Sequence, residues 1–133
     1  MPLGELIDGK AISARLLAEL EQQISALKQR GVQPGIAFIR VGEDPASQVY
    51  VGRKEKACAA LGLFSQTRVL DANTPQAELL SLIACLNEDP RIHGILVQAP
   101  LPAQIDGGAV YSAVRPDKDV DGFHPVNMGK LLL

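Results

Sequence analysis

The chain contains 133 residues, a length typical of one compact domain or of part of a larger protein. Hydrophobic residues make up 47% and charged residues 21%, close to the average for globular proteins, which argues against disorder and fibrous repeats. The formal net charge of -2 excludes the bulk basic field that collects nucleic acid or anionic lipid. We therefore expect neither a nucleic-acid nor a membrane partner.

The cellular location is predicted from what the sequence lacks. Its apolar stretches are far shorter than the ~20 residues that cross a bilayer. The first residues do not form a secretory signal, so a cytoplasmic location is expected. Cys58 and Cys85 have neither metal-ligand nor redox-motif spacing, and we expect two free, packed thiols.

Helical and strand patterns alternate along the chain. The first helical stripe contains Ile12, Leu16 and Leu20 at steps of four residues. The expected elements are a helix over 9–30, a strand over 36–41, a helix over 46–61, a strand over 63–70, a helix after Thr74-Pro75 that ends near 89–90, a strand over 94–98 and a weak helix over 108–114. This order predicts an α/β fold with three layers, in which a mainly parallel sheet is flanked by helices.

Local signals support the helix boundaries. Asp8 can cap the first helix and Gly31 can end it. Asp44 followed by proline is typical of the start of a helix, and Gly62 is expected to end that helix. The strand over 36–41 is apolar and β-branched, which favours a central position in the sheet. Ligands of such sheets bind beyond the carboxyl ends of the strands.

Tyr50 and Lys54 lie four residues apart in the helix that follows this central strand, so they share one helix face. The tyrosine could provide an aromatic platform, and the lysine could carry a proton. The structural alternative is that Tyr50 half-covers the core while Lys54 extends its charge into solvent. The spacing by itself leaves both interpretations open.

Two further polar residues follow apolar or glycine-rich segments. Gln98 ends the strand over 94–98, where its amide could orient a lysine or a ligand, or cap nearby loop backbone. Asp121 lies in the charged loop over 115–125, and a carboxylate there could accept two parallel hydrogen bonds from a flat amino-pyrimidine edge. Asp117, Asp119 and Asp121 alternate like the start of a calcium loop, but its glycine and glutamate are misplaced, and no metal site is expected.

Three ordered blocks carry a resemblance to a known family. They are VGEDPASQVYVGRKEK over 41–56, GILVQAPLP over 94–102 and KDVDGFHPVNMG over 118–129. Together they closely resemble the bifunctional methylenetetrahydrofolate dehydrogenase/methenyltetrahydrofolate cyclohydrolase family, over essentially the whole chain. Ala99 replaces a larger apolar residue of the family pattern. The resemblance implies the folate-binding, catalytic half of a two-domain enzyme of one-carbon metabolism, which serves purine biosynthesis.

The resemblance also implies a role for individual residues. Lys54 corresponds to the catalytic lysine, Gln98 to the amide that orients it, and Asp121 to the carboxylate that anchors the pterin. The implied substrate-binding residues are Tyr50, which stacks on the folate, together with Ser47, Val97, Pro100 and Leu101. The implied reactions are oxidation of methylenetetrahydrofolate by NADP and hydrolysis of the methenyl product to formyltetrahydrofolate.

The domain organisation follows from the same resemblance. Residues 1–122 are expected to form the catalytic, folate-binding domain, and 123–133 to begin the connection to an NADP-binding Rossmann domain that this chain does not include. No Gly-x-Gly-x-x-Gly motif occurs, so no cofactor-binding residues are expected here, and a short-chain dehydrogenase is disfavoured although it also uses Tyr-x-x-x-Lys. A homodimer is implied for the full enzyme. The alternatives are a truncated folate-binding module without turnover and an interaction fragment that binds no folate.

Overall fold

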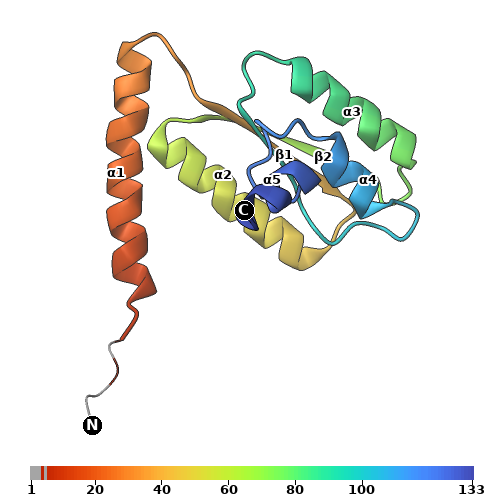
Figure 1. Ribbon diagram of the computed structural model, residues 1–133, viewed down its shortest axis with the longest axis horizontal. Helices are drawn as coiled ribbons and strands as arrows, with labels where there is room; N and C mark the ends of the chain where they lie inside the picture. The colour runs from red at the N-terminus through yellow and green to blue at the C-terminus, as the bar shows by residue number, and fades with distance from the viewer. Residues whose placement is uncertain (1–3, 5) are drawn as a thin grey trace.

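The computed structural model describes residue 4 and residues 6–133 (Figure 1). Each predicted helix and strand is present, with its ends shifted by a residue or two, and a final helix was not predicted. In chain order the elements are α1 (Gly9–Gln29), β1 (Gly35–Val41), α2 (Pro45–Leu61), β2 (Phe64–Leu70), α3 (Gln76–Glu88), β3 (Gly94–Val97), α4 (Gly107–Ala113) and α5 (Pro125–Leu131).

The strands form a parallel sheet in the order β2-β1-β3, which confirms the central position of β1. Helix α2 covers one face of the sheet, and α3 and α4 cover the other (Figure 1). The predicted three-layer α/β fold is therefore confirmed. Because all strands are parallel, their carboxyl ends meet at one edge, where the segments after β1 and β3 come together.

Each face of β1 supplies one half of the core. Ala37, Ile39 and Val41 pack with the apolar side chains of α3 and α4. Phe38 points the other way and packs with Val51 of α2. This division follows from the two-residue period of a strand, which sends successive side chains to opposite faces. Burial of each large apolar side chain contributes about 1.5–3 kcal/mol.

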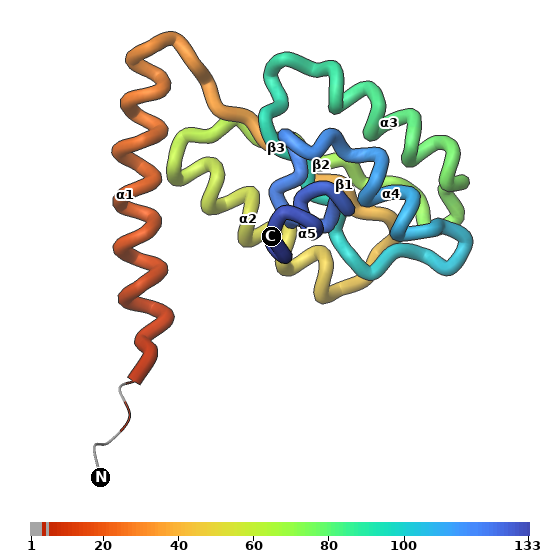
Figure 2. Tube along the Cα trace, in the orientation of Figure 1, coloured from red at the N-terminus to blue at the C-terminus, as the bar shows by residue number. Residues whose placement is uncertain are grey.

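Helix α1 extends away from the sheet and contacts the carboxyl-terminal part of α2 (Figures 1 and 2). Ile24 is buried, whereas Leu16 and Leu20 are 49% and 43% exposed. The predicted helix is confirmed, but most of its apolar stripe is not part of the core. Periodicity predicted the helix without showing whether a neighbour covers that stripe.

The predicted helix caps are confirmed at three ends. Asp8 accepts a hydrogen bond from the Ala11 N–H at 3.0 Å. Asp44 accepts the Ser47 N–H at 2.7 Å, and Gly62 ends α2 in the left-handed conformation with φ 71°. Thr74-Pro75 repeats the cap-then-proline pattern of Asp44-Pro45, but Thr74 does not cap α3: the cap position is held by Pro75, whose backbone is extended, and no side chain caps this helix.

Cys58 is buried as expected, and desolvation, together with the charge of Glu55, raises the pKa of its thiol. Cys85 is exposed, so the expectation of a packed thiol was wrong for this residue. Position 85 lies on the outer side of α3, away from Leu79 and Ile83, which face the sheet. The sequence at a single cysteine does not show whether its side chain faces the sheet or the solvent.

Gly35 lies where the start of β1 closely approaches the segment before β3. A Cβ atom at this position would lie 2.0 Å from the Arg91 carbonyl oxygen. We expect Gly35→Ala to lower the free energy of unfolding by about 1–3 kcal/mol, measured by urea denaturation. Gly52→Ala is the control, since nothing lies within 4 Å of a Cβ there, and a helical alanine should stabilise. Equal stabilities of the two variants would contradict the close approach.

Candidate active site

Predicted site residues from three segments meet beyond the carboxyl ends of the strands. Tyr50 and Lys54 lie on α2, which follows β1, and Gln98 lies directly after β3. Asp121 lies in the loop that leads from α4 to α5. Its carboxylate is close enough to Lys54 for the lysine charge to act on it. The parallel sheet thus brings together residues that are far apart in sequence.

Lys54 and Gln98 are in direct contact. The Lys54 Nζ donates a hydrogen bond to the Gln98 Oε1 at 3.1 Å, and the Gln98 Nε2 donates to the Ala99 carbonyl at 2.9 Å. A carbonyl oxygen only accepts, so the amide nitrogen must face Ala99 and the amide oxygen must face the lysine. Gln98 therefore hydrogen-bonds both Lys54 and the loop backbone, which are the two partners that the sequence left open.

The surroundings of Asp121 raise the pKa of its carboxyl group. Desolvation by the surrounding protein raises the pKa of this surface carboxyl above its ordinary 3.8, the nearby Lys54 opposes the shift, and Asp119 adds to it. Tyr111 of α4 also faces the loop, and burial and the Asp121 charge raise its pKa. The Tyr111 ring contacts Phe123 edge to face, with centroids 5.1 Å apart.

Ser47 is buried in the first turn of α2 and does not lie on an open surface. Only 3% of it is exposed, and its Oγ lies 2.8 Å from Asp44 Oδ2 and 3.2 Å from the Ala99 carbonyl. Hydrogen bonds from the Ser47 N–H and hydroxyl lower the pKa of Asp44. Ser47 thus connects the start of α2 with the turn that holds Gln98.

The remaining predicted substrate-binding residues differ in placement. Tyr50 is 56% exposed and available for stacking, Pro100 is exposed, and Leu101 is partly buried. The Val97 side chain is 3% exposed and packs in the core with α3 and α4, on the face of the sheet opposite α2. It therefore does not line the surface beside Lys54, because alternation along β3 sends Gln98, and not Val97, toward α2.

Two contributors to this site were not found from the sequence. The Ala99 carbonyl sets the orientation of the Gln98 amide, and Tyr111 faces Asp121. A backbone acceptor has no side-chain signature, and Tyr111 lies in a short helix without a polar motif. The alternating aspartates, which resembled the start of a calcium loop, have protein partners instead. Asp117 pairs with Arg115 at 2.8 Å, and both oxygens of Asp119 accept N–H groups.

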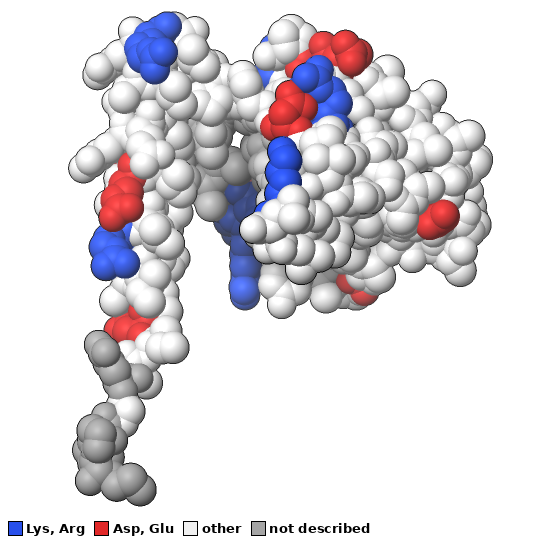
Figure 3. Space-filling model, viewed as in Figure 1, with Lys and Arg blue, Asp and Glu red and all other residues white. Residues whose placement is uncertain are grey.

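No single charge dominates the face of the molecule that Figure 3 shows. On the face drawn in Figure 3, acidic and basic side chains are interspersed and form no continuous patch of one sign. A hollow of about 470 Å³, lined by Phe64, Arg91 and His93 among others, lies at the amino ends of the strands. It is at the opposite edge of the sheet from Lys54 and Gln98, so it is not part of this site.

Carboxylates occupy the N-termini of two helices, α2 and α4. Asp44 occupies the N-terminus of α2, and Asp106 accepts the Gly108 and Ala109 N–H groups at the N-terminus of α4. A phosphate would meet a carboxylate at both positions. Within residues 4 and 6–133, no cluster of three or more potential metal ligands is found. No helix among these residues is long and apolar enough to span a membrane.

Comparisons with known proteins identify a family and relatives that match most of the chain. Residues 7–121 match the family described as "Tetrahydrofolate dehydrogenase/cyclohydrolase, catalytic domain". The chain is 53% identical over 131 residues to bifunctional protein FolD 2 of Geobacter metallireducens, covering 98% of this chain and 46% of that protein. It is 53% identical over 129 residues to bifunctional protein FolD of Moorella thermoacetica, covering 97% of this chain and 46% of that protein.

Solved structures show the same fold. The bifunctional FolD enzyme of Campylobacter jejuni superimposes with a TM-score of 0.91 at 48% identity, covering 93% of this chain and 44% of that chain. The Trypanosoma brucei enzyme, solved with NADP cofactor and an inhibitor, gives 0.91 at 40% identity, covering 98% and 45%. The chain thus spans under half the length of these relatives. On this evidence, it belongs to the tetrahydrofolate dehydrogenase/cyclohydrolase family and corresponds to its catalytic domain.

Proposed function

We propose that residues 1–122 form the folate-binding catalytic domain of a cytoplasmic, homodimeric methylenetetrahydrofolate dehydrogenase/methenyltetrahydrofolate cyclohydrolase. Residues 123–133 begin the connection to an NADP-binding domain. The family match and the names of the relatives support this assignment. The NADP in the Trypanosoma brucei structure supports the choice of cofactor.

The Lys54–Gln98 hydrogen bond is the observation that carries the proposal. In the cyclohydrolase step, water adds to the methenyl carbon and loses a proton. The bond from that carbon to one folate nitrogen then breaks, the hydroxyl oxygen gives up its remaining proton and becomes the formyl carbonyl, and the nitrogen takes up a proton. Lys54 is placed to move these protons, and Gln98 holds its amine in position. The hydrogen bond between Gln98 and the Ala99 carbonyl keeps the amide oxygen directed at the lysine.

The substrate would lie across the exposed surface beside Lys54. The exposed Tyr50 ring offers a stacking face one helical turn before the lysine. Asp121 would accept hydrogen bonds from the pterin edge, while Pro100 and Leu101 would contact the folate from the turn after β3. Ser47 is buried, so its role would be indirect. Val97 is also buried, so it would contact the folate through its backbone. Together these contacts orient the one-carbon unit toward Lys54.

Asp121→Ala tests the binding half of this proposal. We expect at least about tenfold weaker binding of tetrahydrofolate in a titration, because hydrogen bonds to a charged group contribute about 1.5–3 kcal/mol. Asp117→Ala is the control, since Asp117 lies in the same loop but pairs with exposed Arg115. If both variants bind as the wild type does, Asp121 does not anchor the pterin.

Turnover separates this proposal from a folate-binding module. We expect the 133-residue chain to accelerate hydrolysis of methenyltetrahydrofolate above the buffer rate, followed by its absorbance. Binding without acceleration would assign the chain as a binding module whose turnover needs further residues. Absence of both binding and hydrolysis would overturn the proposed function for this chain.

A further inference from the structure

The carboxylate of Asp119 is surrounded by hydrogen-bond donors from the loop that carries Asp121. Its Oδ1 accepts the Gly122 N–H at 3.1 Å, and its Oδ2 accepts the His124 N–H at 2.8 Å. The Asn127 Nδ2 also donates to Oδ2 at 3.0 Å. One side chain therefore closes the loop upon itself and ties it to α5.

These donors keep Asp119 ionised. Burial of the carboxylate by itself opposes ionisation. The hydrogen bonds from Asn127 and from the His124, Phe123 and Gly122 N–H groups outweigh this effect, so the pKa of Asp119 lies below its ordinary 3.8. An ionised carboxylate accepts through both oxygens, which is what this arrangement of donors requires.

The backbone before Asp121 is also anchored to the body of the domain. Asp119 forms an isolated bridge with Ile95 of β3, and the Ile95 N–H donates to the Lys118 carbonyl at 2.7 Å. The Lys118 Nζ donates to the Leu86 and Asp89 carbonyls at 3.1 and 3.0 Å, at the end of α3. The loop thus starts from a fixed position beside β3.

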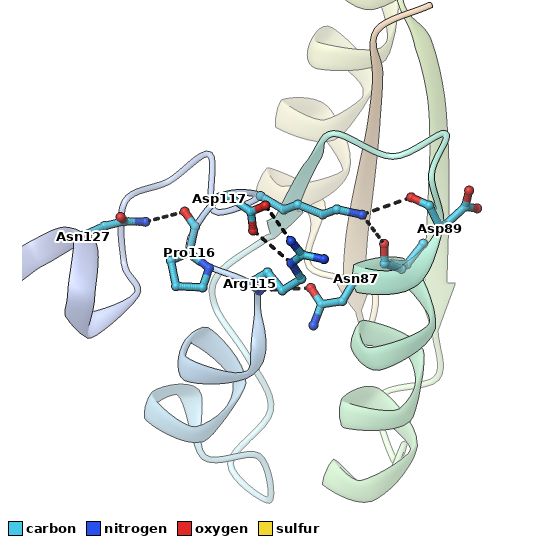
Figure 4. Close-up of polar contacts among 8 residues, drawn as sticks. Asn87, Asp89, Arg115, Pro116, Asp117 and Asn127 are labelled. Carbon is cyan, nitrogen blue, oxygen red and sulfur yellow. Dashed lines mark hydrogen bonds and ion pairs between the residues drawn. The ribbon is translucent and has the colours of Figure 1, made fainter.

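Asn127 adds a second tie between the two ends of the loop. Figure 4 shows its side chain reaching the Pro116 carbonyl, at 2.8 Å, while Arg115 and Asp117 pair with each other nearby. The same Asn127 amide nitrogen contacts Asp119. Backbone on both sides of Asp121 is therefore held by side chains that do not themselves face Lys54.

We propose that Asp119 is a positioning residue, which holds the loop in the conformation that places the Asp121 carboxylate beside Lys54. Gly122, directly after Asp121, has φ 73°, and Asp119 binds its N–H in this left-handed conformation. Both oxygens of Asp119 are already occupied by donors of the protein, so we assign it no contact with the substrate. The inference rests on the proposed function only for the identity of the ligand that Asp121 contacts.

Asp119→Asn is the direct test because it preserves shape but replaces one acceptor oxygen with a donor. Whichever way the amide turns, it faces an N–H group of Gly122, His124 or Asn127 with another N–H. We expect about tenfold weaker tetrahydrofolate binding, and faster amide exchange at Gly122 and His124 with unchanged protection in β1. Asp117→Asn is the matched control and should leave all three measurements unchanged.

The titration of Asp121, followed by carbon NMR of its carboxyl group, provides a readout that general destabilisation does not move. The groups that face Asp121 are Lys54 from α2, Tyr111 from α4 and Asp119 from its own loop. Asp119→Asn removes a like charge and loosens the surrounding loop. The lost charge and the lost desolvation lower the pKa of Asp121, whereas separation from Lys54 raises it. Asn127→Ala keeps the Asp119 charge and is therefore titrated beside Asp119→Asn, so that a shift of the Asp121 titration in both variants reports the loosened loop.

The double variant Asp119→Asn/Asp121→Asn decides whether Asp119 acts through Asp121. Its folate affinity should equal that of Asp121→Asn alone, whereas independent contributions would add. If Asp119→Asn does not fold, Asn127→Ala removes one donor and should produce smaller changes in the same direction. Unchanged loop exchange and Asp121 titration would overturn the positioning role. Absence of folate binding in the wild type would overturn the proposed function, while exchange and titration would still decide the role of Asp119.

Discussion

Lys54→Met is expected to slow hydrolysis of methenyltetrahydrofolate by at least about 100-fold, because positioned proton transfer typically contributes factors of about 100 to 10,000. Methionine retains an unbranched side chain of similar length but cannot donate to the Gln98 Oε1, which accepts from Lys54 at 3.1 Å. The loss should fall mainly on kcat, since folate binding is assigned to Tyr50 and Asp121. Initial rates measured over a range of substrate concentrations separate kcat from KM.

Lys56→Met is the matched control for this experiment. Lys56 is exposed on the same helix, two residues beyond Lys54, and the substitution removes the same charge. Its kcat should stay near that of the wild type. A comparable loss in both variants would attribute the effect to helix charge, and an unaffected Lys54→Met would remove the lysine from the mechanism.

Phe38→Ala is expected to lower the free energy of unfolding by about 3–5 kcal/mol, the usual cost of deleting a buried aromatic side chain. Phe38 is 1% exposed and packs with Val51, Cys58 and Leu96 between β1 and α2. Its removal leaves a cavity beneath the helix that carries Tyr50 and Lys54. Urea denaturation measures this effect as a lower midpoint with an unchanged slope.

Phe123→Ala provides the aromatic control. Phe123 is 46% exposed and contacts Tyr111 edge to face, so its removal should cost only about 0.5–1.5 kcal/mol. A Phe38→Ala cost as small as that of Phe123→Ala would mean that the packing between β1 and α2 contributes little. The midpoint of each variant is compared with that of the wild type under the same conditions.

Short-range features of this fold were predictable from the sequence. Asp44 with Pro45 starts α2 and Gly62 ends it, because a cap needs only side chains within a few residues of the helix end. The alternation of helical and strand patterns predicted the parallel sheet with β1 at its centre. Helix α5 was not predicted, since its start lies within a loop rich in charge, proline and glycine.

The resemblance of three sequence blocks also selected the site residues, but their contacts required the folded chain. Lys54 and Gln98 are separated by 44 positions and meet only when the carboxyl ends of β1 and β3 lie at one edge. The sequence named Val97 as a pocket residue, whereas the register of β3 turns its side chain into the core. Likewise, the alternating aspartates gave no indication that Asp119 would bind backbone N–H groups.

The strands, their parallel arrangement, the family and all helices except α5 could be predicted from the sequence. These properties depend on local caps, on hydrophobic period and on the order of motifs. Three features became visible in the folded chain alone: the Ala99 carbonyl orients Gln98, Asp119 accepts N–H groups of the Asp121 loop, and most of the apolar stripe of α1 stays exposed. Backbone acceptors have no residue signature, and the neighbour that a side chain meets depends on how distant segments pack.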